Sequence, residues 1–344
     1  MVFEQSYAVA RAAFRAEAAQ IGADVDSITI DADGQRAEDG SELTIDLASW
    51  GEGERCVVMS SGLHGVEGYI GSATQRLLMA SKPPERCRYL LIHAINPWGM
   101  VQFRRVNESN VDLNRNFLAA EEDYTGSPDH YGRLNGLLNP TRQFSRVEFL
   151  ARSAWQILRH GYEPLKQAIA GGQYDYPQGL FWGGNRLEEG PEKLIKVLPG
   201  LLDGVEDILW IDVHSGLGAY GELTYLLEAS TESALHQRLS AQFGAQVQAW
   251  DQQGGVAYAI RGGFPTALAQ LFGHRLAMLT CEYGTHAAVE ILRLLVRENQ
   301  IVHHGGDREA AKSAMRRAFY PGDSAWQNKA RRSAEELIRA LATD

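Results

Sequence analysis

A histidine and a glutamate three residues apart, His64 and Glu67, follow a short apolar run that ends in a glycine turn. The run, Val57–Met59, has the composition of a buried strand, and after Gly68 the apolar residues recur at helical steps of three and four. An imidazole and a carboxylate on one face of a first helical turn can bind a single cation, and such ligands suit zinc. This spacing is common by itself, and a solvated helix start is the alternative interpretation.

Two further side chains of the same chemical types also follow apolar runs. His214 comes directly after Asp207–Val213, and Glu282 comes directly after Leu276–Cys281. In open α/β sheets ligands bind at the carboxyl ends of the strands, so we expect these residues to meet the first pair there. Two histidines and one glutamate leave the fourth position of a zinc site open for water. The metal lowers the pKa of that water, and a nearby carboxylate can take its proton.

The loop after the next apolar run is rich in asparagine and arginine. Arg104 and Arg105 precede a second polar group, which contains Asp112, Asn114 and Arg115. Guanidinium groups can hold a carboxylate through two parallel hydrogen bonds, or a developing oxyanion. We therefore expect both arginines and Asn114 to form an anion cradle. A solvated loop with ordinary ion pairs is the alternative.

Strand-like and helical patterns alternate along most of the chain, which indicates an α/β fold with right-handed crossovers. The predicted strands are Ser27–Ile30, Leu43–Leu47, Cys56–Ser60, Tyr89–Ile95, Asp207–Val213, Leu223–Leu227, Gln246–Trp250 and Leu276–Cys281. We interpret residues 1–344 as a single domain with an irregular, partly helical insertion at about 118–190. Within it, Val147–Ala170 predicts a helix pair or one long helix, and residues 171–184 predict a loop wall.

Composition limits the classes of partner. The chain has 344 residues, 44% of them hydrophobic and 22% charged, and its net charge of -10 argues against nucleic acid. There is no run of 18 apolar residues and no secretory-signal pattern, so we expect no membrane association. Cys56, Cys87 and Cys281 are too few and too scattered for a disulfide framework, which favours a cytoplasmic location.

Two other motifs are weaker. Residues 216–221 match GxGxxG after a strand, but the next segment resembles another strand and not the helix that a dinucleotide site requires. His303 and His304 are interpreted as a solvated or capping pair at a helix end. We therefore predict neither a dinucleotide site nor a second metal site from these residues.

The combined motifs resemble the zinc carboxypeptidase family of carboxypeptidase A, and within it a bacterial branch that carries a domain of unknown function. The matching segments occur in the family's order: HGVE (64–67), NPWG (96–99), Arg105, VDLNRNF (111–117), DVHSG (212–216) and CEYGT (281–285). The site plan is also similar to that of aspartoacylase and succinylglutamate desuccinylase. The resemblance implies a three-layer α/β/α fold with a mixed, mostly parallel sheet of about eight strands.

The resemblance also implies a role for each matching residue. His64, Glu67 and His214 correspond to the ligands of one zinc ion per chain. Glu282 corresponds to the general base that later protonates the leaving amine, and Arg105 to the arginine that stabilises the oxyanion.

The remaining roles concern the substrate and the first histidine. Asn114 and Arg115 correspond to the pair that binds the terminal carboxylate of the substrate, and Asp112 to the carboxylate that orients His64. Asn110 stands where many relatives have glycine. The family's mobile tyrosine has no motif match, and Tyr258 is its candidate counterpart.

These residues predict a zinc-dependent hydrolase that cleaves an amide bond next to a free carboxylate. Its substrate would be a short peptide, a cell-wall peptide fragment or an acylated amino acid. One alternative is an aspartoacylase-type N-deacylase with a cramped pocket. Another is a non-catalytic carboxylate-binding protein on the same fold.

Overall fold

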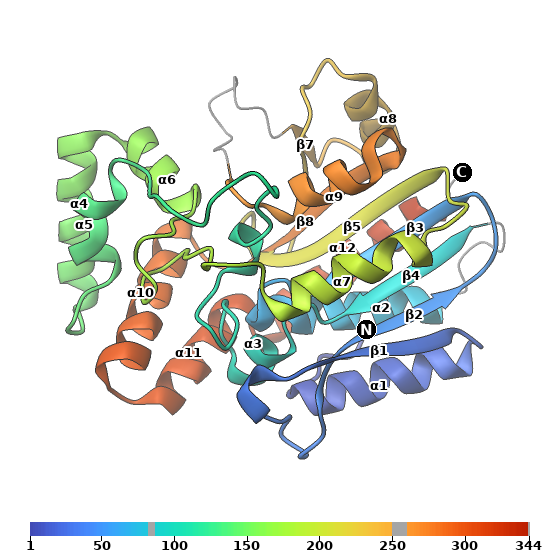
Figure 1. The fold of residues 1–344 in the computed structure, drawn as a ribbon, viewed down its shortest axis with the longest axis horizontal. Helices are drawn as coiled ribbons and strands as arrows, with labels where there is room; N and C mark the ends of the chain where they lie inside the picture. Colours follow the sequence, from blue (N-terminus) through green and yellow to red (C-terminus); the bar gives the residue numbers. More distant parts are fainter. Residues whose placement is uncertain (82–86, 250–259, 343–344) are drawn as a thin grey trace.

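The computed structural model describes residues 1–81, 87–249 and 260–342, and its strands form one eight-stranded sheet with helices on both faces (Figure 1). The strands are β1 (Asp24–Ile30), β2 (Leu43–Trp50), β3 (Arg55–Ser61), β4 (Arg88–His93), β5 (Asp207–Gly216), β6 (Leu223–Leu227), β7 (Val247–Ala249) and β8 (Leu276–Gly284). The helices are α1 (Tyr7–Gln20), α2 (Gly68–Ala80), α3 (Pro97–Gln102), α4 (Tyr131–Leu138), α5 (Arg146–His160), α6 (Tyr162–Ala170), α7 (Glu189–Leu201), α8 (Ala234–Phe243), α9 (Phe264–Phe272), α10 (Ala288–His304), α11 (Arg308–Phe319) and α12 (Ser324–Leu341).

The sheet has the strand order β1-β2-β4-β3-β5-β8-β6-β7. Its centre, β4-β3-β5-β8, is parallel. On one side β2 pairs antiparallel with β4 and with β1, and on the other side β6 pairs antiparallel with β8 and parallel with β7. Helices α1, α2 and α12 lie on one face and α7 and α9 on the other (Figure 1). The predicted three-layer α/β/α fold with a mixed sheet is confirmed.

The central strands are apolar because both of their faces are covered. Val57, Val58 and Met59 of β3 are fully buried, as expected for a parallel strand between two helical layers. The turn that follows β3 approaches α3 so closely that a Cβ on Gly65 would lie 2.1 Å from the Gly99 carbonyl carbon. The glycine of the HGVE motif is therefore required for packing, and this packing places His64 at the end of β3.

The segment predicted as an insertion contains helices that lie together, away from the sheet and beside α10 and α11 (Figure 1). Residues 147–170 form two helices, α5 and α6, which separate at Gly161 with a φ of 81°. This agrees with the helix-pair interpretation. Their buried residues, among them Phe149 and Leu165, share an apolar cluster with residues of α10 and α11.

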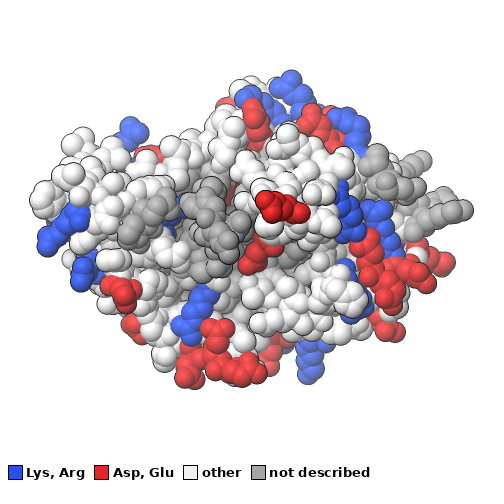
Figure 2. All heavy atoms as spheres, turned by 90° about the horizontal axis from the view of Figure 1, so that it is seen from above, with Lys and Arg blue, Asp and Glu red and all other residues white. Residues whose placement is uncertain are grey.

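Among the described residues, no helix combines the length and the apolar character needed to cross a bilayer. Acidic and basic side chains are interspersed on the face shown in Figure 2. Charge on that face is therefore distributed and not gathered into one patch.

A buried carboxylate joins α1 to the sheet. Asp46 of β2 is fully buried and accepts hydrogen bonds from Arg15 Nε at 2.8 Å, Arg11 Nε at 3.2 Å, Thr44 Oγ1 at 2.7 Å and Ser27 Oγ at 2.9 Å. Burial raises the pKa of Asp46, but the hydrogen bonds from Arg15 and Thr44 outweigh this effect, so its pKa lies below the usual value.

We expect Asp46→Ala to lower the free energy of unfolding by about 3 kcal/mol at pH 7, because it leaves two arginines without their shared partner. A carboxylate with a depressed pKa stabilises the fold above its unfolded-state pKa. The difference between the variant and the parent should therefore stay constant from pH 8 to pH 5 and shrink only below about pH 4.

Urea unfolding across this pH range measures the effect, with Asp24→Ala on the exposed part of β1 as the matched control. The control should stay within about 0.5 kcal/mol of the parent. A difference for Asp46→Ala that already changes between pH 8 and pH 5 would contradict the assignment.

Candidate metal centre

The residues predicted to do chemistry meet at the carboxyl ends of the central parallel strands. His64 begins the short helical turn Gly65–Glu67 after β3, and His214 lies near the end of β5. Glu282 of β8 is directly opposite His214 in the strand register. The chain leaves β3 toward β4 on one side, whereas β5 lies on the other side, so the site is at a point where the strand order reverses. Such points are the usual ligand-binding crevices of open α/β sheets.

Three of these side chains face one another at short distances. The Nδ1 atom of His64 lies 3.1 Å from Oε1 of Glu67, and Nδ1 of His214 lies 2.9 Å from Oε2 of the same carboxylate. All three residues are buried, and one potential ligand atom from each lies within 4.8 Å of the others. Among the described residues this is the one His, Cys, Asp and Glu group with such geometry.

The geometry of this group fits a bound cation better than a hydrogen-bonded cluster. Although His64 Nδ1 is close to Glu67 Oε1, the two atoms do not have hydrogen-bond geometry, and this buried nitrogen has no hydrogen-bond partner. A buried polar atom without a partner needs an explanation, and a bound ion is one of the common ones. Two imidazole nitrogens and a carboxylate are the donor set of open zinc sites, in which a fourth position remains for water.

An aspartate carboxylate contacts Nε2 of each histidine. Asp112 Oδ1 lies 3.1 Å from Nε2 of His64, and Asp212 Oδ2 lies 2.7 Å from Nε2 of His214. Both rings therefore direct Nδ1 toward Glu67 and Nε2 toward an aspartate. Carboxylates in this position orient metal-binding histidines and raise their basicity.

Asp112 was expected beside His64 from the motif resemblance, whereas Asp212 was missed. The signal was available, because alternate residues of a strand share a face and Asp212 stands two residues before His214. The other oxygen of Asp212 accepts a hydrogen bond from Ser60 Oγ at 2.6 Å, and this hydroxyl accepts one from Trp210 Nε1 at 2.8 Å. These bonds between β5 and β3 fix the carboxylate.

We expect Asp212→Asn to weaken the binding of a divalent cation, with zinc as the probe, by about 10- to 100-fold, because the amide is a poor partner for an imidazole that must stay oriented. Competition against a chromophoric chelator measures this affinity. Asp203→Asn, an exposed residue before β5, is the matched control and should bind zinc like the parent. Unchanged affinity in Asp212→Asn would remove its positioning role.

The two arginines of the predicted anion cradle point to different places. Arg105 donates from Nε to Asp112 Oδ2 at 2.9 Å and lies 3.4 Å from Glu67 through Nη1. Arg104 instead donates from Nε to Glu298 of α10 at 2.5 Å and from Nη2 to Asn110 at 3.0 Å. The expectation that both line the cradle was wrong for Arg104, because a buried guanidinium needs a partner and Glu298 supplies it.

Asn114 and Arg115 follow Asp112 in a short helical turn beside the site. Asn114 Oδ1 accepts a hydrogen bond from the backbone amide of Phe264 at 2.9 Å. The Arg115 side chain is buried, donates from Nη1 to the Asn114 carbonyl at 2.8 Å and packs against Gly172. Its charge is one of those that lower the pKa of Asp112. Their role toward a substrate carboxylate stays a prediction.

The protonation behaviour of the site follows from burial and close charges. Burial raises the pKa of Glu67, but His64 and His214 reverse the effect and hold its pKa well below the usual range. For His214, burial lowers the pKa, yet the facing Asp212 and Glu67 raise it well above the usual value. Without a cation, the site therefore keeps a proton on His214 next to an ionised Glu67.

Glu282 has a different environment from Glu67. Burial raises the pKa of Glu282 to about 7, with His214 lowering it and Glu67 raising it. Its Oε2 atom is buried and has no hydrogen-bond partner. A carboxyl group whose pKa lies near neutrality, beside a potential metal centre, is suited to accept and donate a proton at physiological pH.

Residues 171–184, here called the wall strip, are part of the site. The carbonyl of Trp182 accepts a hydrogen bond from the amide of Asp112 at 2.8 Å, and the hydroxyl of Tyr174 donates to the Arg115 carbonyl at 2.7 Å. The Arg105 guanidinium carbon lies 5.6 Å from the ring centroid of Phe181. The predicted loop wall therefore holds the site residues directly.

Phe181 was not predicted as a functional residue. Its φ of 59° is left-handed, which is a strained conformation for an aromatic residue, and its carbonyl accepts a hydrogen bond from the amide of the buried Gln173 at 3.0 Å. No sequence pattern indicates this conformation. Tyr258, the candidate counterpart of the mobile tyrosine, lies outside the described residues.

Comparison with solved structures shows similar folds at low identity. Bovine thrombin-activatable fibrinolysis inhibitor, in complex with tick carboxypeptidase inhibitor, has a TM-score of 0.46 and 12% identity, over 91% of this chain and 95% of that one. The murein-tripeptide amidase MpaA from Escherichia coli O157 has a TM-score of 0.38 and 16% identity, over 87% and 93%. A succinylglutamate desuccinylase from Silicibacter sp. TM1040 has a TM-score of 0.38 and 13% identity, over 82% and 67%.

None of these structures assigns an activity to this chain. The comparison with curated proteins gave no match. A family model described as protein of unknown function (DUF2817) matches residues 3–332, which include every site residue described above. The chain therefore belongs to the DUF2817 family, in agreement with the predicted branch of unknown function.

Proposed function

We propose that the protein is a zinc-dependent hydrolase that cleaves an amide bond next to a free carboxylate. The observation that carries this proposal is the arrangement of His64, Glu67 and His214, whose ligand atoms face one another in a buried site. Asp112 and Asp212 form hydrogen bonds with the two histidines, and the nearby Glu282 has a buried oxygen without a hydrogen-bond partner. A structural ion-pair network needs neither the unpartnered nitrogen nor the unpartnered oxygen.

His64, Glu67 and His214 would hold the cation, which supplies Lewis acidity toward a carbonyl group and acidifies a water molecule when it is bound. Glu282 would accept the proton from the attacking water and pass it to the leaving amine. Arg105 would stabilise the negative charge that develops on the carbonyl oxygen of the substrate.

The preference for a free carboxylate is proposed for Asn114 and Arg115. Both lie in one turn next to Asp112, and Arg115 brings a buried positive charge to this side of the site. A guanidinium and a carboxamide can together bind a carboxylate by donating several hydrogen bonds to it, some of them charge-assisted. A short peptide, a cell-wall peptide fragment and an acylated amino acid all carry such a group next to an amide bond.

Metal analysis by mass spectrometry of the purified protein, beside a His64→Ala control, is the first test. We expect about one zinc per chain in the parent and its loss in the control. A panel of short peptides, cell-wall peptides and N-acyl amino acids would then be assayed with the zinc-loaded protein. Each substrate has a matched version with its carboxylate converted to an amide, which we expect to be cleaved poorly.

The panel separates the remaining alternatives. Cleavage of small N-acyl amino acids, but of no peptide, would identify an N-deacylase. Zinc binding with no hydrolysis of any member, but with carboxylate-dependent binding, would favour the non-catalytic carboxylate-binding protein. Absence of metal after zinc is offered would overturn the metal centre itself.

A further inference from the structure

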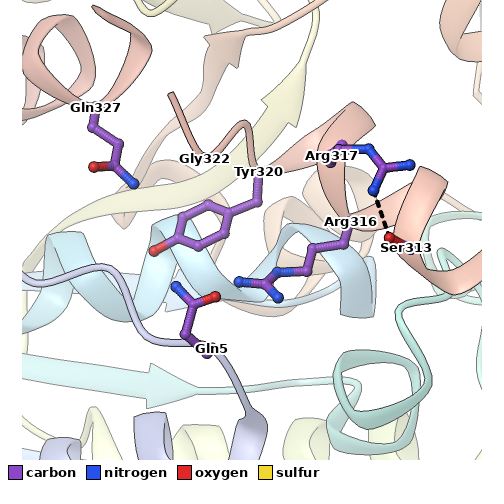
Figure 3. A pocket seen from close by; sticks show the side chains of 7 residues that line it. All are labelled: Gln5, Ser313, Arg316, Arg317, Tyr320, Gly322 and Gln327. Carbon is purple, nitrogen blue, oxygen red and sulfur yellow. Dashed lines mark hydrogen bonds between the residues drawn. The ribbon is translucent and has the colours of Figure 1, made fainter. Parts of the chain in front are cut away.

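A pocket with a volume of about 260 Å³ lies where the N-terminal segment meets the end of α11 and the start of α12 (Figure 3). Its side chains include Gln5, Ser313, Arg316, Arg317, Tyr320 and Gln327. Two guanidiniums, two carboxamides and two hydroxyl groups thus surround the space, and no acidic residue is among the described lining residues. The pocket is rich in hydrogen-bond donors and carries positive charge.

Tyr320 shows that this pocket has an unfilled position. Its side chain is only 3% exposed, and its hydroxyl has no hydrogen-bond partner. The ring cannot easily turn away, because it packs against Phe3, Tyr69 and Trp326 at centroid distances of 5.6, 5.6 and 5.8 Å. Figure 3 shows the hydroxyl directed into the space between Gln5, Gln327 and Arg316. A buried hydroxyl of this kind needs a partner, which a ligand can provide.

The positive charge of the pocket is also uncompensated. Arg316 is half-buried and lies over the Phe103 ring, with its guanidinium carbon 5.7 Å from the centroid. Arg317 donates to Ser313 Oγ at 2.5 Å. Within the described residues neither arginine forms an ion pair with a carboxylate.

Two glutamates of the N-terminal part of the chain are bound by Arg76. Burial raises the pKa of Tyr320 and the charge of Glu4 raises it further. The Glu4 carboxylate accepts a hydrogen bond from Arg76 Nη1 at 2.7 Å. Glu17 is bound by the same guanidinium through Nε at 2.9 Å. Arg76 therefore occupies both carboxylates, and the charge on Arg316 and Arg317 remains available in a chain whose net charge is -10.

We propose that this pocket binds a small oxyanion of the phosphate class, either free phosphate or the phosphate group of a small metabolite. Phosphate has several acceptor oxygens, so it can receive hydrogen bonds from Arg316, Tyr320 and a carboxamide that come from different elements. The guanidinium of arginine can donate two parallel hydrogen bonds to two oxygens of one phosphate group. The carboxyl end of α11 favours arginine in its last turn even without a ligand, but this preference does not explain the unpartnered hydroxyl of Tyr320.

Calorimetric titration with inorganic phosphate, at constant ionic strength with chloride as the balancing anion, tests the proposal. We expect saturable binding at one site in the parent. Tyr320→Phe and Arg316→Gln should each weaken it by about tenfold or more, since each removes a hydrogen bond to a charged group. Arg332→Gln, on the exposed face of α12, removes the same charge and should bind phosphate like the parent.

The ligand-free stability of Tyr320→Phe is a second measurement. Its melting temperature should be unchanged or higher, because the variant keeps the ring and removes only an unpartnered polar atom. Weaker binding in this variant therefore cannot be attributed to unfolding. Phosphoserine would be titrated next, and tighter binding than that of phosphate would identify the source as a phosphorylated metabolite.

Three results would overturn the proposal. If Tyr320→Phe binds phosphate with the affinity of the parent, the pocket is not the binding site. If Arg316→Gln and Arg332→Gln lose the same amount of phosphate affinity, the binding reflects unspecific charge attraction. Phosphate also binds metal ions, so binding that disappears in His64→Ala would place the anion at the metal centre. The proposal is independent of the hydrolase activity, because His64→Ala should still bind phosphate.

Discussion

Glu282→Gln should lower the turnover of the zinc-loaded protein by about 100- to 10,000-fold while its zinc content stays near one per chain. The amide keeps the size of the side chain but cannot accept a proton from water. Steady-state kinetics on the best substrate of the panel measures the loss, and mass spectrometry measures the metal. Turnover equal to that of the parent would remove Glu282 from the proposed chemistry.

The pH dependence of the same assay gives an independent criterion. The carboxylate form is the active one, so activity should fall as the pH drops through the pKa of Glu282. Burial raises this pKa to about 7 without a cation, and the charge of a bound cation would favour the carboxylate and lower it. We expect the midpoint of the acid limb at or below about pH 7, and its absence from the residual activity of Glu282→Gln.

Arg105→Gln should reduce kcat/KM by about 100- to 1,000-fold, because the guanidinium is the positive group placed to stabilise an oxyanion. The reduction should appear mainly in kcat if the interaction strengthens in the transition state. Arg105 also holds Asp112, so zinc affinity is measured alongside. Loss of zinc that accounts for the whole decrease in activity would assign Arg105 to positioning alone.

Arg104→Gln is the matched control, since it changes the adjacent arginine in the same loop. Removing its guanidinium leaves Glu298 buried without a partner, and we expect a loss of about 3 kcal/mol in the free energy of unfolding. At a temperature where the variant is folded, its kcat should match that of the parent. The two adjacent arginines would then separate stability from catalysis.

The sequence allowed prediction of those site residues that directly follow a strand, because the strand end determines where such a residue lies. His64, His214 and Glu282 each follow an apolar run, and parallel strands bring such positions to one edge of the sheet. The strand and helix periodicities also predicted the layers, because both faces of the central strands are buried. These inferences depend on local pattern and on general rules of sheet topology.

Direction of individual side chains could not be predicted in the same way. Arg104 and Arg105 look equivalent in the sequence, yet Arg104 is bound to Glu298, which is 194 residues away. Phe181 lies against Arg105 and has a left-handed backbone, and no composition signal marks that conformation. Long-range partners and strained backbone are properties of the folded chain.

Asn110 shows how a departure from the family pattern can be accommodated. The motif resemblance implies glycine at this position, and the φ of Asn110 is 66°, in the left-handed region that glycine and asparagine tolerate best. Its side chain accepts from Arg104 and donates to the Pro177 carbonyl at 2.9 Å. Asparagine therefore keeps the turn and adds a link to the wall strip, which glycine could not make.

Helices α4, α5 and α6 differ in their contacts with the wall strip. Tyr131 of α4 donates to the Leu180 carbonyl at 2.6 Å, and Asn139 after α4 accepts from the Leu180 amide at 2.9 Å. In contrast, α5 and α6 contribute mainly apolar contacts such as Phe149 and Leu165. Shortening or replacing α5 and α6 should therefore leave the proposed metal centre in place. The same change in α4 or the wall strip would displace the backbone that bonds to Asp112 and Arg115.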